Sequence, residues 1–216
     1  MDWEAKLAWA QVEHEARAGR PPAAGERPDL HLTAVASAAW AAGLAALMLG
    51  RRDEAAGWLR RAADEYRASW EIAPPGSWGR PIAALRCRLM AGDQAGARRD
   101  AEWALSAGAL PADGPIQRYC GVLALLVLRE DDAAAREADV LVEEGLEPRT
   151  VAEALAALAR RDAEAYGRAL RGVLHSFETR DAFLEDVRVA DTVLVLQALA
   201  AERDLEVALP SALLPV

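Results

Sequence analysis

Three histidines carry the side chains in this sequence that bind metal ions most readily: His14, His31 and His175. A helix brings two ligands to one ion when they lie three or four residues apart. None of the three has another histidine at that spacing, and only His175 has a carboxylate so placed, Glu178. The spacing therefore predicts no metal centre.

Two acidic clusters, REDD at 129–132 and LED at 184–186, are the candidates for acid–base chemistry. A diphosphate site needs aspartates at both ends of a helical turn, but Asp131 and Asp132 are followed by three alanines. We interpret both clusters as helix N-caps and solvated turns. Paired carboxylates of the glycosidase type stay open as an alternative, because the sequence singles out no pair.

No nucleophile or phosphate loop stands in a catalytic context. The chain has no GxSxG sequence, and Cys87 and Cys120 lie in apolar helical runs without a neighbouring histidine. Such cysteines are typical of free buried thiols in a reducing compartment. The stretch MAGDQAGA follows a predicted helix and lacks Gly-Lys-Ser/Thr. We therefore predict a protein that is not an enzyme and uses no cofactor.

The charge balance bears on the class of partner. With 25 Lys and Arg against 34 Asp and Glu, the net charge is −9 and the isoelectric point is near 5.0. Proteins that bind nucleic acids generally need a cationic surface, so we expect no nucleic-acid partner.

One segment is long enough to cross a membrane. Residues 30–50, LHLTAVASAAWAAGLAALMLG, contain no Asp, Glu, Lys or Arg. Most of them are small, and a soluble helix buried on all sides explains the run equally well. The N-terminal MDWEAKLAWAQ is amphipathic and acidic, unlike a signal peptide. We expect a cytoplasmic protein without a membrane span.

The elements that would position these residues are helices, because Ala, Leu, Arg and Glu dominate the composition. An extended tail should follow the last helix. The predicted helices cover about 2–18, 30–49, 53–72, 80–91, 93–107, 115–128, 131–144, 148–159, 162–178 and 187–203.

Four similar turns recur at intervals of about 30 to 40 residues, a period typical of helical repeats. Each contains an aspartate that we expect to cap the next helix: Asp53, Asp93, Asp132 and Asp162. We predict an all-α fold with a single domain over 1–216. Its architecture would be a tightly packed α-α superhelix of about four or five antiparallel helical hairpins.

The hairpin WAAGLAALMLGRRDEAAGWLRRAADEY resembles a degenerate tetratricopeptide repeat, although the period is longer and the closing proline is missing. The matching positions are Trp40, Gly43, Leu47, Gly50, Ala55, Ala56, Leu59 and Ala62. This resemblance implies a TPR-like superhelix.

The stretches DAEAYGRALRGVLHSFETRD and VADTVLVLQALAAERDLEVALPSALLP are similar to the C-terminal part of all-helical bacterial immunity proteins that neutralise polymorphic toxins. This resemblance implies that the chain binds a protein and does not catalyse a reaction.

Polar residues inside otherwise apolar helices are candidate binding residues. They are Arg86, Arg88, Arg118 and Asp191. Arginine forks on a concave surface bind carboxylates or phosphates. The alternative is that Arg88 and Arg118 pair with acidic residues of neighbouring helices.

The corner ASWEIAPPGSWGRPIAAL places two tryptophans around Pro-Pro-Gly. Trp70, Trp78 and Arg80 form either a staple between two helices or a rigid exposed anchor for a partner. With the acidic charge, these residues favour a protein-binding function with another protein as partner, the chain itself being a monomer or homodimer. A small-molecule-binding helical domain or an uncharacterised enzyme is the alternative.

Overall fold

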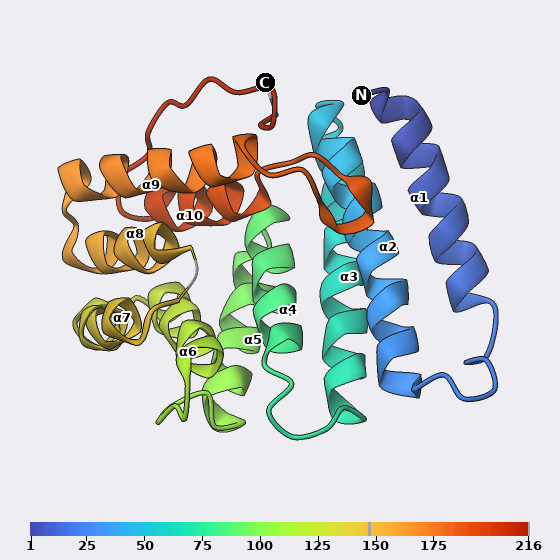
Figure 1. The fold of residues 1–216 in the computed structure, drawn as a ribbon, viewed down its shortest axis with the longest axis horizontal. Coiled ribbons are helices and arrows are strands. Elements are labelled where there is room, and N and C mark those ends of the chain that lie inside the picture. Colours follow the sequence, from blue (N-terminus) through green and yellow to red (C-terminus); the bar gives the residue numbers. More distant parts are fainter. Residues whose placement is uncertain (147, 216) are drawn as a thin grey trace. The chain divides into compact units, whose positions relative to one another are not determined.

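The computed structural model describes residues 1–146 and 148–215, which form helices and no strand (Figure 1). The α-helices are α1 (Trp3–Ala18), α2 (Pro28–Met48), α3 (Arg52–Glu71), α4 (Gly79–Met90), α5 (Gln94–Ser106), α6 (Pro115–Leu128), α7 (Asp131–Glu144), α8 (Arg149–Arg160), α9 (Ala163–Glu178) and α10 (Asp191–Ala201). A short 3-10 helix, η1, covers Leu184–Asp186.

The predicted all-α class and tight packing are confirmed, and nine of the predicted helices agree with the structure within about two residues at each end. The tenth was expected from about residue 187 but begins at Asp191. Val187 is extended, with φ −94° and ψ 103°, and is buried. The segment therefore serves as a packed connection before the helix starts.

The chain divides into two compact units. The first holds Met1–Asp93, Asp181–Val189 and the residues from Leu214 onward; the second holds Gln94–Arg180 and Ala190–Leu213. The single domain expected over 1–216 stays a prediction, because compactness of a part does not show that it folds alone.

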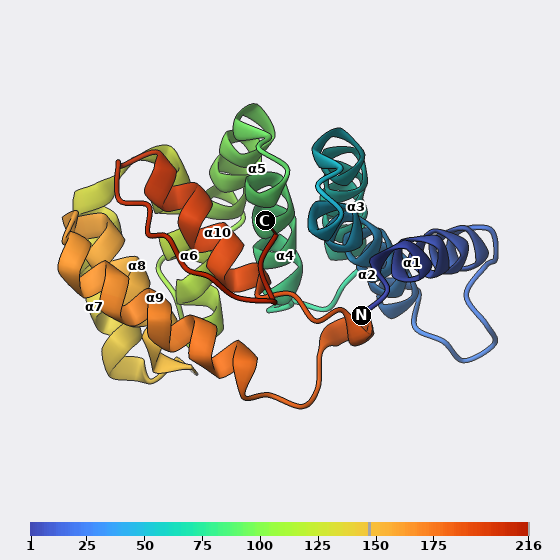
Figure 2. The same ribbon diagram turned by 90° about the horizontal axis from the view of Figure 1, so that it is seen from above.

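In the first unit α1, α2 and α3 lie side by side, with α2 in the middle (Figures 1 and 2). Helix α2 is apolar all round and buried over most of its length, because it has neighbours on both sides. At Gly43 the two backbones approach closely: a Cβ atom there would lie 2.6 Å from Leu59 Cγ. Helix α4 packs on α3.

The segment Asp181–Val189 also belongs to the first unit. Arg17 of α1 donates to Glu185 Oε1 at 2.7 Å and to the Ala34 carbonyl at 2.9 Å. Helix η1 contacts α2. The last part of the first unit is therefore supplied by residues that follow α9 in the chain.

In the second unit each helix from α5 to α9 packs on the next, and α10 packs on α8 and α9. The chain from Leu205 to Leu213 runs back along α10 (Figure 2). Gln197 of α10 hydrogen-bonds both backbone groups of Val207, and the Ala190 amide donates to the Leu213 carbonyl at 2.9 Å. The expected tail is thus irregular chain tied to α10.

Asp93 and Asp162 lie between helices, and Asp162 has the expected capping bond, accepting from the Ala165 amide at 2.9 Å. Asp53 and Asp132 lie inside the first turns of α3 and α7, whose N-caps are Arg51 and Glu130. The capping prediction is therefore wrong at 53 and 132, because each aspartate is the second residue of its helix and not the residue that precedes it. There the carboxylates face the positive end of the helix dipole.

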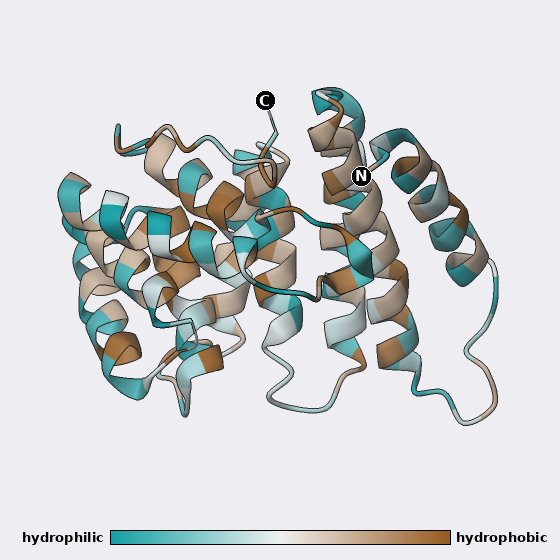
Figure 3. Ribbon diagram, turned by 45° about the horizontal axis from the view of Figure 1, so that its top comes forward, coloured by the Kyte–Doolittle hydropathy of each residue, from teal (hydrophilic) through white to brown (hydrophobic). Residues whose placement is uncertain are grey.

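Among the described residues, α2 is the one helix whose length and apolar composition would allow it to cross a membrane. However, 72% of its apolar window is buried inside the protein. Core helices of soluble proteins have the same composition, so α2 gives only weak support to a membrane span. Figure 3 shows that hydrophilic and hydrophobic stretches alternate on α1.

Candidate functional site: the Trp70–Trp78 corner

The corner is formed by local chemistry between α3 and α4. Two prolines follow the end of α3, and Gly76 takes a positive φ of 82° that favours glycine. The Ser77 hydroxyl donates to the Pro74 carbonyl at 2.7 Å. The N-cap position of α4 is Trp78 rather than Ser77, so the serine closes the turn instead of capping the helix.

The two indoles of the corner pack on each other. The ring centroids of Trp70 and Trp78 lie 4.9 Å apart, with a 44° angle between the planes. Trp78 is buried and Trp70 is half-buried. Trp78 thus contacts α3 through Trp70, which is the contact that the staple interpretation predicts.

Arg80 is held by a buried carboxylate. Its Nη2 donates to Asp29 Oδ2 at 2.6 Å, and its Nε donates to Ser69 Oγ at 2.7 Å. Arg27 donates to both oxygens of Asp29, at 3.0 and 2.7 Å. These hydrogen bonds from Arg27, with the nearby charge of Arg80, hold the pKa of Asp29 below its ordinary value.

Two side-chain hydroxyls bond the backbone at the same end of the α2–α3 hairpin. The hydroxyls of Thr33 and Ser69 both donate to the Asp29 carbonyl, at 2.8 and 2.7 Å. Sequence analysis missed Asp29 and Ser69. The signal for Asp29 was its position directly after Pro28, but its partner Arg80 lies 51 residues away, and no local pattern predicts that contact.

Two large apolar side chains beside these hydrogen-bonded residues face solvent. Leu30 follows Asp29 and is 49% exposed, and Ile72 lies one turn beyond Ser69 and is 53% exposed. Because Asp29 and Ser69 are in contact, both apolar residues lie at the same end of the hairpin. We call Leu30, Ile72 and the half-buried Trp70 the corner surface, which rests on the buried Trp78 and on Arg80.

Two further predicted binding residues, Arg86 and Arg88, lie on α4. Arg88 is buried and bonds Asp64 of α3 and Asp93, the latter at 3.2 Å. Arg86 is half-buried on α4. For Arg88 the structure shows the pairing between elements that was the alternative to ligand binding.

Two predicted residues belong to the second unit. Arg118 donates to both oxygens of Glu144 at 3.0 Å and also bonds Glu137, and the Glu144 contact is the main cause of its raised pKa. Asp191 is buried at the start of α10, where it accepts from Thr192 at 3.4 Å. The seven predicted residues therefore do not all come from one unit.

A pair that sequence analysis missed, the buried His14 and the half-buried Glu65, connects α1 to α3. His14 Nε2 lies 2.7 Å from Glu65 Oε1, and the imidazole meets the Trp58 ring at 5.3 Å between centroids. Burial raises the pKa of Glu65 above its ordinary value. The two residues lie 51 positions apart, too far for helical spacing to reveal them.

Both cysteines are buried and outside any disulfide. Burial raises the pKa of Cys120 to about 12, which keeps this thiol protonated and unreactive. In the part of the chain that the structure describes, no three His, Cys, Asp or Glu side chains gather as they would around a metal ion.

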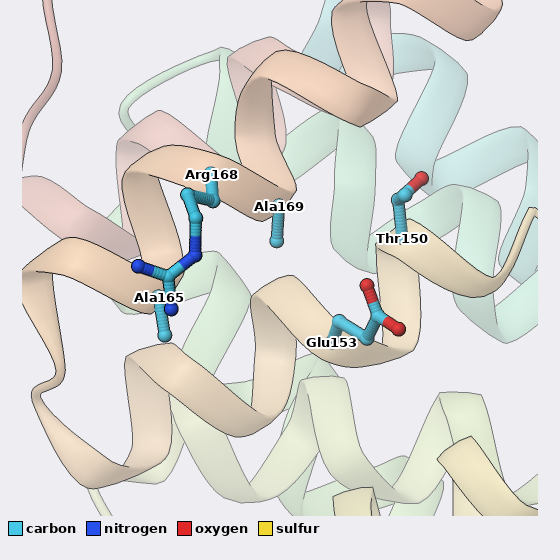
Figure 4. A pocket seen from close by; sticks show the side chains of 5 residues that line it. All are labelled: Thr150, Glu153, Ala165, Arg168 and Ala169. Carbon is cyan, nitrogen blue, oxygen red and sulfur yellow. The ribbon is translucent and has the colours of Figure 1, made fainter.

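A pocket of about 290 Å³ lies between α8 and α9 (Figure 4). Its charged residues, Arg168 and Glu153, extend from facing helices, and their charged ends lie on different sides of Ala169. Arg168 bonds Glu164, and Glu153 accepts from Arg149 at 3.1 Å. Both charges are thus already paired, and the pocket is near the lower size limit of ligand sites.

Comparison of this chain with family models, with curated proteins and with solved structures finds no match.

Proposed function

We propose that the protein is a non-enzymatic, cytoplasmic helical-repeat module that binds another protein through the corner surface. In this proposal the successive antiparallel hairpins form a TPR-like superhelix. Support comes from the packing order, since within each unit most helices contact the helix that precedes or follows them in the chain. Repeat proteins of this kind commonly act as binding scaffolds.

The observation that carries the proposal is the combination of a rigid framework and exposed apolar side chains. The Trp70–Trp78 stack and the Asp29–Arg80 ion pair fix the backbone of the corner. Leu30 and Ile72 project from that framework about half exposed. Preorganised apolar anchors of this kind lower the entropic cost of binding.

The sharpest form of the proposal is an immunity protein whose partner is a basic toxin. The net charge of −9 supports this form, because an acidic protein attracts a cationic partner during diffusion. The alternative, small-molecule binding, predicts a closed pocket lined by Trp and Arg. The α8–α9 pocket has one arginine and no tryptophan in its lining, so this pocket does not match that description.

A photo-crosslinking amino acid at position 72 tests the proposal. In the host cell we expect one discrete crosslinked protein from position 72. Position 116 is the matched control, because Ile116 has a similar exposure of 51% and lies in the second unit. Ile72→Asp should reduce capture of the same partner at least about tenfold, while Ile116→Asp leaves it unchanged. No crosslink at 72, or equal crosslinks at both positions, would overturn the proposal.

A further inference from the structure

Helix α1 has two apolar faces, and only one is covered. Leu7, Ala10 and His14 are buried on the inner face, towards α2 and α3. The opposite face carries five exposed apolar residues. We call these residues the outer stripe: Ala5, Ala8, Trp9, Val12 and Ala16. Trp9 is 38% and Val12 is 63% exposed.

The spacing of the outer stripe is that of a coiled-coil seam. Ala5, Trp9, Val12 and Ala16 are separated by four, three and four residues, the alternation of a and d positions in a heptad. An amphipathic helix at a protein edge needs only its inner face to be apolar. The heptad on the outer face therefore indicates a second helix as its partner.

Charged residues beside the stripe indicate that the partner helix is α1 of a second copy of the chain. In an antiparallel pair of two α1 helices, Trp9 faces Val12 of the second copy and Ala5 faces its Ala16. The same register places Lys6 opposite Glu13 of the second copy, on one side of the seam. On the other side Ala8 faces Glu15, without repulsion. The Lys6 ammonium lies 3.7 Å above the Trp9 ring, beside the seam.

We propose that the outer stripe of α1 pairs with the same stripe of a second copy, in an antiparallel twofold dimer with two Lys6–Glu13 contacts. Twofold symmetry requires a self-complementary surface, and this stripe provides one. Alanines at three of its five positions allow close approach of the helices. The inference is independent of the proposed function, since it uses none of the corner residues.

The dimer should dissociate on dilution. A standard interface buries about 800 Å² on each partner, and five residues of one helix bury less than that. We therefore expect sedimentation velocity of the full chain to show a monomer at low concentration and a dimer at high concentration. A monomer at every concentration would overturn the proposal.

Charge reversal tests the register. Lys6→Glu places glutamates opposite Glu13, and Glu13→Lys places lysines opposite Lys6, so each variant alone should dimerise at least about tenfold more weakly. An equimolar mixture of the two should recover the wild-type affinity, because every facing pair is again opposite in charge. Lys6 also lies in the field of Glu185 and Asp186, but that contact cannot produce recovery on mixing. Failure to recover would overturn the antiparallel register.

Two further variants complete the experiment. Val12→Asp introduces a charge at an exposed seam position and should abolish the dimer. At concentrations where the wild type is monomeric, the two proteins should have the same thermal midpoint. Glu15→Lys is the matched control, because it faces Ala8 in this register and should leave dimerisation unchanged. A dimer that survives Val12→Asp, or one that Glu15→Lys weakens, would place the interface elsewhere or in another orientation.

Discussion

Arg203 places a charged side chain where no solvent reaches it: its side chain is 0% exposed. It donates to the carbonyls of Leu126 and Leu199, at 2.8 and 2.9 Å, and pairs with Asp131. One residue thereby ties the end of α6 and the start of α7 to the end of α10. A buried charge held this way is expensive to leave without its partner.

We expect Arg203→Met to lower the free energy of unfolding by about 3 kcal/mol, because it removes the hydrogen bonds to two carbonyls and to Asp131 from a buried position. Urea denaturation followed by circular dichroism measures the change. Arg168→Ala is the control: it removes an arginine that is 60% exposed and paired with Glu164, and should cost less than about 1 kcal/mol. Equal losses would contradict the structural role of Arg203.

The second prediction at this scale concerns Glu65, whose pKa is raised by burial. The folded protein binds this proton more tightly than the unfolded chain does, so the stability linked to it is present at low pH. That stability is lost as the pH rises through the folded-state pKa. Glu65→Gln does not ionise and should gain stability relative to wild type as the pH rises above the ordinary pKa range of a glutamate.

Urea denaturation at several pH values below and above this range measures the difference. Glu15→Gln, on the exposed face of α1, serves as the control that removes the same formal charge without the buried contact. A difference between wild type and Glu65→Gln that does not change with pH would show that burial of Glu65 has no linkage to folding.

At the scale of elements, close helix approach depends on individual glycines. We expect Gly43→Ala to destabilise the protein by about 1 to 3 kcal/mol, because the new Cβ would meet the buried Leu59. Gly57→Ala, on exposed α3 surface with nothing within 4 Å of its Cβ position, should stabilise by about 0.5 to 1 kcal/mol. Thermal unfolding measures both; a shared sign would contradict the packing argument.

The helix positions were predictable from sequence because their ends depend on neighbouring residues. Gly50, Gly92 and Gly145 take positive φ values at the turns, and such glycines are visible in a sequence. The start of α10 was not predictable, because the extended Val187 and its neighbour Val189 are buried by contacts that form only in three dimensions. Residues near helix ends thus predict the helices better than they predict the irregular segments that connect them.

The candidate site was predictable in its residues but not in its contacts. Two tryptophans around Pro-Pro-Gly marked the corner, and they do contact each other. The Asp29–Arg80 and His14–Glu65 pairs join helices across 51 residues each. Helical spacing describes only neighbours three or four residues apart, so such pairs need the folded chain to be seen.

At the scale of the whole molecule, the chain passes between its two compact units more than once. It leaves the first compact unit after Asp93, returns for Asp181–Val189 and leaves again before coming back near its end. The two proposed surfaces, the corner and the outer stripe of α1, both belong to the first unit and share no residue. A variant at one surface therefore leaves the side chains of the other surface unchanged.

The contact between Arg17 and Glu185 has a consequence for biosynthesis. When the ribosome has released α1 to α4, the acidic partner of Arg17 has not yet been translated, because it lies 168 residues further along the chain. The nascent N-terminal helices must wait without this contact until the segment at 181–189 emerges. Native assembly of α1 to α4 is therefore completed only after residues 181–189 have been translated.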